Sequence, residues 1–235
     1  MKREIVFSAI ILIALSFPSC MSSYKVSLPD YKMASERKSF GISAVHGGIV
    51  ENTDMSLIPS AATDAFSGAT STGLSASLHY EKRIKRNYFV TGIDVMINNQ
   101  TFTYNDVANR YAGTRDIRVS QFRIPLLYQV GLFRQSIPEG VLKIRAGLSA
   151  GYTRFNISNS GFLPETVTTY PFSVGPAIGG SITPWRAANG ASLSITGEMW
   201  RSFSPGFSDV YNVGEQSGMS YGKIGLIFHL PTGTF

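Results

Sequence analysis

The sequence predicts an all-β protein, an eight-stranded antiparallel up-and-down transmembrane β-barrel. Eight stretches of the chain alternate apolar and polar residues with period two, the pattern of strands that have one apolar face. The connections between them run alternately long and short, as in a membrane barrel with tight turns at one end and loops at the other. After the N-terminus, no segment has the continuous apolar run of a spanning helix, so any membrane span has to be a barrel.

The N-terminus has the pattern of a secretory signal peptide over residues 1–19. Lys2 and Arg3 precede an apolar run that is too short to cross a bilayer. Cys20, the single cysteine, follows directly and resembles the lipidation site of bacterial lipoproteins, although Phe17 and Pro18 depart from that motif. Two interpretations stay open: a lipid anchor at Cys20, or a cysteine that is cleaved off or left as a free thiol. Residues 20–38 are expected to form a flexible periplasmic lead.

The barrel is predicted over residues 39–230, followed by a short tail at 231–235. Its first four strands are expected at 40–45, 73–81, 88–98 and 122–132. In the second strand, Leu74 and Leu78 share one face while Ser75 and His79 share the other. In the fourth strand, Pro125 cannot donate to the hydrogen-bond ladder, which predicts a bulge or a local break.

The last four strands are expected at 142–152, 172–181, 192–199 and 223–230. The fifth alternates most regularly, because every even position from Leu142 to Tyr152 is apolar. The closing strand places Ile224, Leu226 and Phe228 on one face. Segments of about ten residues suffice to cross a bilayer at the tilt of a barrel.

Long connections are expected at 51–72, 105–116, 158–170 and 203–219, and short ones at 82–87, 134–140 and 186–190. With an even strand count, both termini lie on the short-turn side, which is expected to be the periplasm, with the long loops extracellular. The turn at 82–87 is strongly basic, whereas the first, third and fourth long loops contain acidic residues and neither Lys nor Arg. The basic turn fits either attraction to anionic headgroups or an ordinary solvated turn.

Aromatic residues collect near both ends of the predicted strands, which is typical of the two aromatic girdles of membrane barrels. The expected turn-side and loop-side girdles consist of Tyr80, Tyr88, Phe89, Tyr128, Phe133, Trp185 and Phe228, and of Phe102, Tyr104, Tyr152, Phe155, Phe172, Phe203 and Tyr221.

If the apolar faces point outward, six charged side chains enter the lumen. They are Asp94, Arg123, Lys143, Arg145, Glu198 and Lys223. An eight-stranded barrel has room for side chains or one small ligand, so we expect a paired charge network that plugs it. A narrow anion-preferring pore is the alternative for this set.

The sequence contains no recognisable catalytic, cofactor-binding or metal-binding motif. His46, His79 and His229 lack metal-ligand spacing, and no serine is marked as a nucleophile. We therefore expect a non-enzymatic protein without a cofactor. The positive net charge of +6 is spread over turns and lumen, so no nucleic acid partner is expected.

Four segments carry a family resemblance: 121–128 (QFRIPLLY), 146–152 (AGLSAGY), 174–180 (VGPAIGG) and 223–228 (KIGLIF). They resemble the outer-membrane β-barrel domain family of Bacteroidetes, related to the PorT-like small barrels, over about residues 39–230. The resemblance implies a small eight-stranded outer-membrane barrel and supplies no catalytic residues.

The leading hypothesis is a non-enzymatic outer-membrane barrel with a structural or interaction role, such as an accessory subunit of an envelope complex. Its expected partners are outer-membrane lipid and envelope proteins that contact the loops or periplasmic turns. A lipid-tethered or soluble barrel that binds a small apolar ligand is the second hypothesis; it requires Lys143, Arg145 and Glu198 on the outside. A lipid-modifying enzyme is the third.

Overall fold

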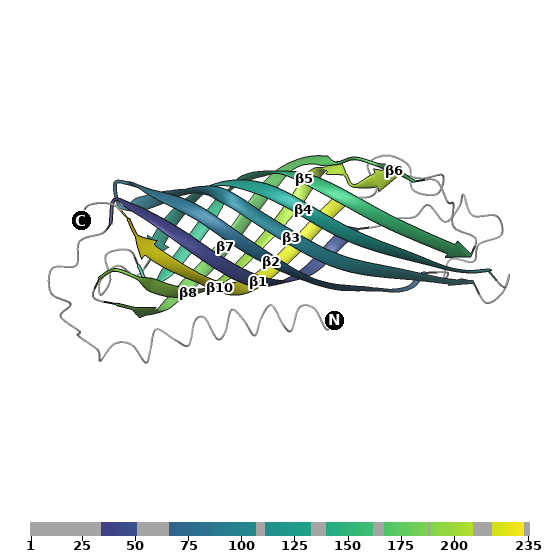
Figure 1. The fold of residues 1–235 in the computed structure, drawn as a ribbon, viewed down its shortest axis with the longest axis horizontal. Helices are drawn as coiled ribbons and strands as arrows, with labels where there is room; N and C mark the ends of the chain where they lie inside the picture. Colours follow the sequence, from purple (N-terminus) through teal and green to yellow (C-terminus); the bar gives the residue numbers. More distant parts are fainter. Residues whose placement is uncertain are drawn as a thin grey trace. The chain divides into compact units, whose positions relative to one another are not determined.

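A computed structural model shows a closed barrel of eight antiparallel strands (Figure 1). It describes residues 34–50, 66–106, 111–132, 140–161, 167–187, 189–208 and 218–232. The predicted signal peptide and Cys20 lie outside these ranges. No helix in the described ranges is long and apolar enough to cross a membrane. The predicted fold class is confirmed.

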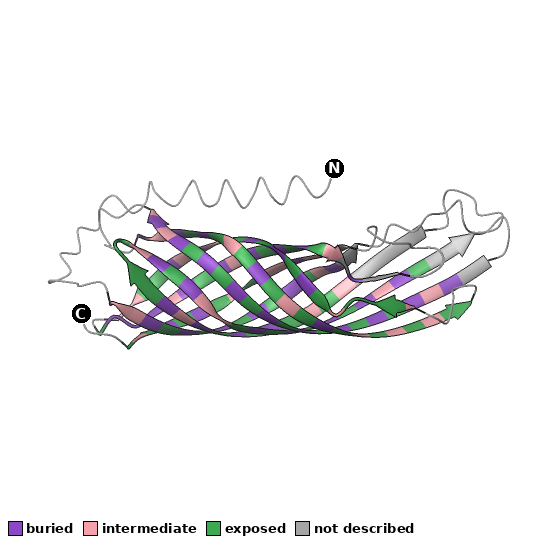
Figure 2. Cartoon of the chain, turned by 90° about the horizontal axis from the view of Figure 1, so that it is seen from above, coloured by how far each residue is buried: buried purple, intermediate pink, exposed green. Residues whose placement is uncertain are grey.

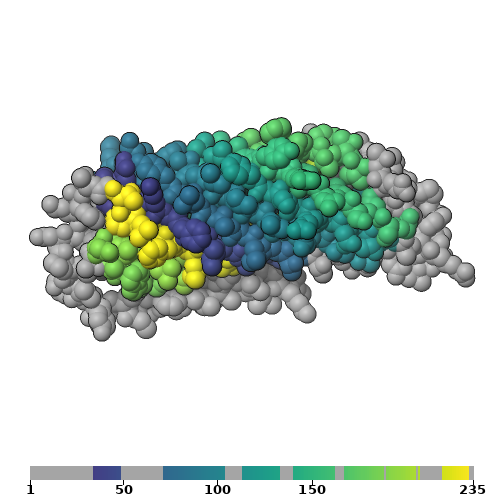
Figure 3. Space-filling model, in the orientation of Figure 1, coloured from purple at the N-terminus to yellow at the C-terminus, as the bar shows by residue number. Residues whose placement is uncertain are grey.

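The barrel strands follow one another around the wall in chain order. They are β1 (Glu36–Val50), β2 (Phe66–Ile84), β3 (Asn87–Asp106), β4 (Tyr111–Leu132), β5 (Leu142–Gly161), β7 (Phe172–Arg186), β8 (Ser192–Pro205) and β10 (Gly218–Pro231). Pairing of β1 with β10 closes the barrel, and the purple and yellow surfaces of these strands meet in Figure 3. The short strands β6 (Thr168–Thr169) and β9 (Phe207–Ser208) form a separate pair.

The two ends of the barrel differ in their connections. At the turn end, strands are joined by residues 85–86, 133–141 and 187–191, and at the loop end by residues 51–65, 107–110, 162–171 and 206–217. Arg37 pairs with Pro231, so the barrel begins and finishes at the turn end. Its first strand starts at Glu36, inside the segment predicted as a lead.

The strands are longer than the sequence pattern indicates, and the extra length lies mostly at the loop end. Strand β4 has 22 residues, where alternation marks only 122–132. Toward the loop end its outward side chains become polar, so the apolar period disappears while backbone pairing continues. The long connection predicted at 105–116 is therefore wrong, because Asp106 pairs with Tyr111.

The hairpin between β2 and β3 has a tight turn. Ile84 pairs with Asn87, which leaves Lys85 and Arg86 as a two-residue turn in which Lys85 has a φ of 58°.

The wall has one local irregularity at Pro125. Pairing of β3 with β4 is interrupted opposite Pro125 without a change of register. The interruption agrees with the missing N–H of proline, and it is a local break rather than a bulge.

The two faces of the wall differ sharply in chemistry. Exposed and buried residues alternate along the strands, seen as green and purple bands in Figure 2. The outward side chains are mainly apolar: Leu74 is 72% exposed, and Ile124, Leu148 and Ile178 are exposed as well. Inward positions are largely polar or charged, including Arg123 at 6% exposure. The barrel thus has an apolar outer surface and a filled polar interior.

The predicted aromatic girdles are only partly right. Phe89, Tyr128, Trp185 and Phe228 are exposed toward the turn end, and Tyr152, Phe172 and Phe203 toward the loop end. Tyr88, Phe102 and Tyr221 point inward and are buried, and Phe155 packs partly buried against the interior cluster. Phe133 and the side chain of Tyr104 lie outside the described residues. Each of the three buried residues occupies a strand position whose side chain points into the barrel. The predicted girdles considered only how close a residue lies to a strand end, not which way its side chain points.

Candidate functional site

The centre of the lumen holds a network of ionised side chains from five strands. Asp94 on β3 lies directly opposite Arg123 on β4, and Glu198 on β8 lies opposite Lys223 on β10. Because residues in register share a face, each pair reaches the interior together. Arg145 joins from β5. Five of the six charges predicted to face the lumen therefore meet at one level.

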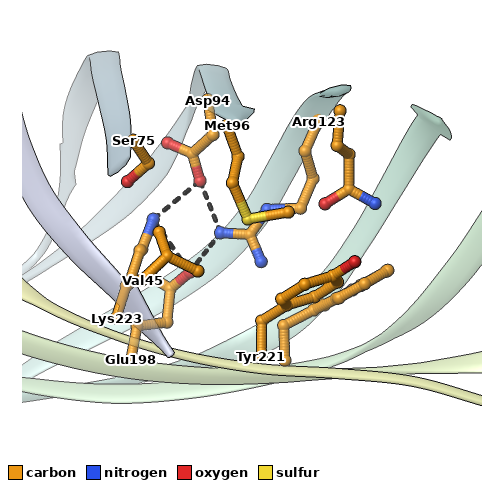
Figure 4. Close-up of a pocket in the computed structure, with 10 residues that line it drawn as sticks. Val45, Ser75, Asp94, Met96, Arg123, Glu198, Tyr221 and Lys223 are labelled. Atoms are coloured by element: carbon orange, nitrogen blue, oxygen red, sulfur yellow. Dashed lines mark hydrogen bonds and ion pairs between the residues drawn. The ribbon is translucent and has the colours of Figure 1, made fainter. Parts of the chain in front are cut away.

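The contacts in this network are short and shared. Arg123 Nη2 donates to Asp94 Oδ2 at 2.5 Å and to Glu198 Oε1 at 2.5 Å. Lys223 Nζ lies 2.8 Å from the same oxygen of Asp94 and 3.2 Å from that of Glu198 (Figure 4). Arg145 Nη2 lies 2.9 Å from Glu198 Oε2. Two carboxylates thus bind three cations.

Two polar neighbours complete the network. His79 Nε2 on β2 lies 2.7 Å from Asp94 Oδ1, and Arg145 Nη2 donates to Thr196 Oγ1 at 2.9 Å. Sequence reasoning placed His79 on the inward face without a partner. His46 on β1 faces outward and is exposed, so it does not approach His79. Each carboxylate oxygen of Asp94 is occupied, which suits a buried charge.

A second charged cluster lies nearer the turn end. Arg37 Nη2 lies 2.6 Å from Glu81 Oε2, and His229 Nδ1 lies 2.8 Å from Glu81 Oε1. The guanidinium of Arg37 also stacks over the Tyr88 ring, 3.8 Å from its centroid. This cluster was not predicted, because Arg37 falls in the segment expected to be a lead and Glu81 is the last residue of the second predicted strand. Both residues occupy alternate strand positions whose side chains point inward, and this alternation was the signal that could have identified them.

Lys143 belongs to the turn-end cluster rather than to the central network. It is 1% exposed and lies opposite Ser181 in the pairing of β5 with β7. Its ammonium group acts electrostatically on both Glu81 and His229. The six predicted charges therefore face the lumen at two levels instead of one.

One chain of contacts in the turn-end cluster has the order acid, histidine, hydroxyl. Beyond Glu81, His229 Nε2 lies 3.1 Å from Ser194 Oγ, and Ser194 Oγ lies 2.9 Å from Thr183 Oγ1. This order matches that of a Ser-His-acid triad. Ser194 is fully buried at 0% exposure, however, and its hydroxyl is shared with Thr183. In this arrangement it joins strands β7, β8 and β10 and is closed to a substrate.

Toward the loop end, apolar and aromatic side chains cluster in the interior beside buried polar ones such as Gln100 and Arg115. The Trp200 and Tyr221 rings stack with centroids 5.8 Å apart, and the Arg123 guanidinium lies 5.6 Å from the Trp200 ring centroid. Met96 and Ile117 are buried in the same cluster. Between this cluster and the ion network is a cavity of about 20 Å³, room for about one water molecule (Figure 4).

The described lumen is thus filled by three successive layers, namely the turn-end cluster, the ion network and the loop-side aromatic cluster. Lys143, Arg145 and Glu198 are buried inside, so the inverted barrel of the ligand-binding hypothesis is wrong. Within the described ranges, no group of three or more His, Cys, Asp or Glu side chains is placed to hold a metal ion.

Comparisons with known proteins give structural neighbours only. No family model matches the chain, and no curated protein matches it. The outer membrane protein OprG from Pseudomonas aeruginosa has 12% identity, coverage of 86% of this chain and 98% of that chain, and a TM-score of 0.46. Neisserial surface protein A has 10% identity, coverage of 86% and 100%, and a TM-score of 0.40. The translocator domain of the autotransporter NalP from Neisseria meningitidis has 10% identity, coverage of 94% and 97%, and a TM-score of 0.42.

Proposed function

We propose that this protein is a non-enzymatic outer-membrane barrel with a sealed lumen, which serves as a membrane-embedded structural or interaction unit. The observation that carries the proposal is the distribution of chemistry across its wall. Large apolar side chains cover the outside, whereas charges fill the inside in pairs. Exposure of such an apolar outer surface to water is energetically unfavourable, whereas contact with lipid is not.

The aromatic side chains support a membrane position. Exposed Phe89, Tyr128 and Trp185 lie toward the turn end, and exposed Tyr152 and Phe172 lie toward the loop end. Aromatic rings at two levels mark the two interfaces of a bilayer, with an apolar band between them. The outward residues of that band include Ile124, Leu126, Leu148 and Ile178.

In this proposal the turn end faces the periplasm and the loop end faces outward. The exposed basic residues Lys82, Lys85 and Arg86 then lie beside the inner leaflet, where they attract anionic headgroups. With the lumen filled, partners are available only at the two ends and the rims. Envelope proteins that bind the loops or the periplasmic turns fit an accessory subunit of a larger complex.

The family resemblance and the lipid anchor are part of the same proposal. Membership of the PorT-like Bacteroidetes barrels rests on the four segments quoted above. Lipidation of Cys20 would add an acyl anchor to the segment that precedes β1. Labelling with a radioactive fatty acid is expected to mark the wild type and not Cys20→Ala. An unlabelled wild type would remove the anchor and leave the barrel unaffected.

The membrane location has a direct test. Expressed with its leader, the protein should remain in the outer-membrane fraction after carbonate washing and migrate faster on gels when it is not boiled. Release as a soluble species would contradict the proposal. Purification of intact complexes from native membrane would then identify the partners.

A further inference from the structure

We propose that Arg118 and Arg154 form a docking site for the phosphate groups of a phosphorylated glycolipid in the outer leaflet. The site lies on the outside of the wall near the loop end, and nothing in the lumen contributes to it. The inference rests on the proposed membrane location, because it needs a bilayer around this surface.

Strand register places the two arginines together on the outer face. Arg118 on β4 lies opposite Asn156 on β5, and Arg154 on β5 lies opposite Ser120 on β4. The two arginines are therefore diagonal neighbours, with Cα atoms separated by about 7–8 Å. Both are exposed, so both guanidinium groups can reach one ligand.

The charge of this pair is not balanced as it is inside the barrel. Arg123 and Arg145 each contact a carboxylate in the lumen, whereas no ion pair links Arg118 or Arg154 to an acid among the described residues. Asp116 shares their face, and its Oδ1 accepts a hydrogen bond from Thr101 Oγ1 at 2.6 Å. Like charges this close on one sheet face repel each other, and an anion between them would remove that cost.

The position of Arg118 and Arg154 along the barrel axis favours a lipid as their ligand. Arg154 follows Tyr152, the last aromatic residue of the outward run on β5, and Tyr152 packs edge-to-face on exposed Phe172 with ring centroids 5.3 Å apart. Aromatic residues at this level mark the membrane interface. Arg118 and Arg154 then lie at the height of the headgroups, where a guanidinium binds phosphate with two parallel hydrogen bonds.

The test uses the full-length protein in phosphatidylcholine nanodiscs that contain rising fractions of bisphosphorylated lipid A. Bound lipid A is counted by native mass spectrometry for the wild type, for Arg118→Gln with Arg154→Gln, and for Arg201→Gln. The last variant removes an exposed charge from the outside of β8, away from this pair. We expect the double variant to bind lipid A about 10-fold to 30-fold more weakly, the effect of two basic residues at an anionic surface, and Arg201→Gln to match the wild type.

Four results would overturn the site: unchanged binding by the double variant, equal losses in both variants, equal binding of dephosphorylated lipid A, or full displacement of lipid A by inorganic pyrophosphate. The last result would assign the site to a soluble anion. Faster migration of unboiled samples is measured on the same preparations in phosphatidylcholine alone. A wild type that does not fold there overturns the membrane barrel itself, whereas a folded wild type without a preference for lipid A overturns only this site.

Discussion

Arg123 is the residue on which the central network depends. One of its nitrogens bridges Asp94 and Glu198, two carboxylates that would otherwise repel each other across the lumen. A buried ion pair adds little net stability compared with apolar packing, but removal of one partner leaves buried charge without compensation.

Replacement of Arg123 by Met is therefore expected to destabilise the barrel by about 3 kcal/mol. The loss should fall at the lower end of the range for broken buried pairs, because Lys223 still contacts both carboxylates. Urea unfolding in lipid vesicles, followed by tryptophan fluorescence, measures it. The control is Arg201→Met, since Arg201 is exposed on the outside of β8. Equal effects of the two substitutions would contradict a structural role of the network.

Ser194 separates the structural interpretation from an enzymatic one. Because its hydroxyl is buried between His229 and Thr183, we expect no labelling of the wild type by a fluorophosphonate probe. Ser194→Ala should instead cost about 1–3 kcal/mol in unfolding free energy, since it leaves buried polar groups without a partner. Labelling of the wild type that disappears in Ser194→Ala would favour the lipid-modifying enzyme.

At the scale of a single element, β4 shows how one strand serves two environments. Its outward side chains are apolar from Phe122 to Tyr128 and polar from Ser120 toward the loop end. Its inward side chains include Gln121, Arg123 and Gln129, all buried. The strand thus crosses the apolar band with about half of its length and extends beyond it with the rest.

The position of a substitution along β4, within the lipid-facing band or at its edge, should determine how strongly it destabilises the barrel. Leu126→Arg places a charge within the lipid-facing band and is expected to cost about 2–4 kcal/mol, whereas Ser120→Arg at the polar boundary should cost about 0–1 kcal/mol. Reversible unfolding from vesicles gives both values. Similar costs at the two positions would mean that lipid does not surround this face.

In the whole molecule, the layers of the lumen follow one another along the barrel, so a permeating ion would have to pass each of them. The Arg37–Glu81 pair, the Asp94–Arg123 pair and the Trp200–Tyr221 stack occupy successive levels, and the described cavity beside the network holds about one water molecule. A permeating ion would have to separate charge pairs that lie within 3 Å of each other. The layers therefore favour a closed barrel over the narrow anion pore.

Purified protein in planar lipid bilayers is accordingly expected to show no steady conductance at moderate voltage. A matched amount of an open porin provides the positive control for insertion and detection. Regular single-channel steps from the wild type, reproduced in independent preparations and preferring anions, would contradict the sealed lumen and support the pore.

The alternation of residue types determined the fold class, the strand count and the face of each strand. These properties follow from local periodicity, because a strand that separates lipid from a polar interior repeats every two residues. Asp94 and Glu198 could be assigned to the lumen on that basis. Strand ends cannot be located from alternation where both faces become polar, so the pattern predicts only half of β4 and too long a connection at 105–116.

Tertiary structure alone decided which inward residues meet. Strand register sets Asp94 opposite Arg123 and Glu198 opposite Lys223, and closure of β10 onto β1 brings His229 to Glu81 across 148 positions of sequence. The two levels of charge in the lumen, the Glu81–His229–Ser194 chain and the Arg118–Arg154 neighbours all depend on register. Register is a property of paired strands, and the alternation within each strand does not encode it uniquely.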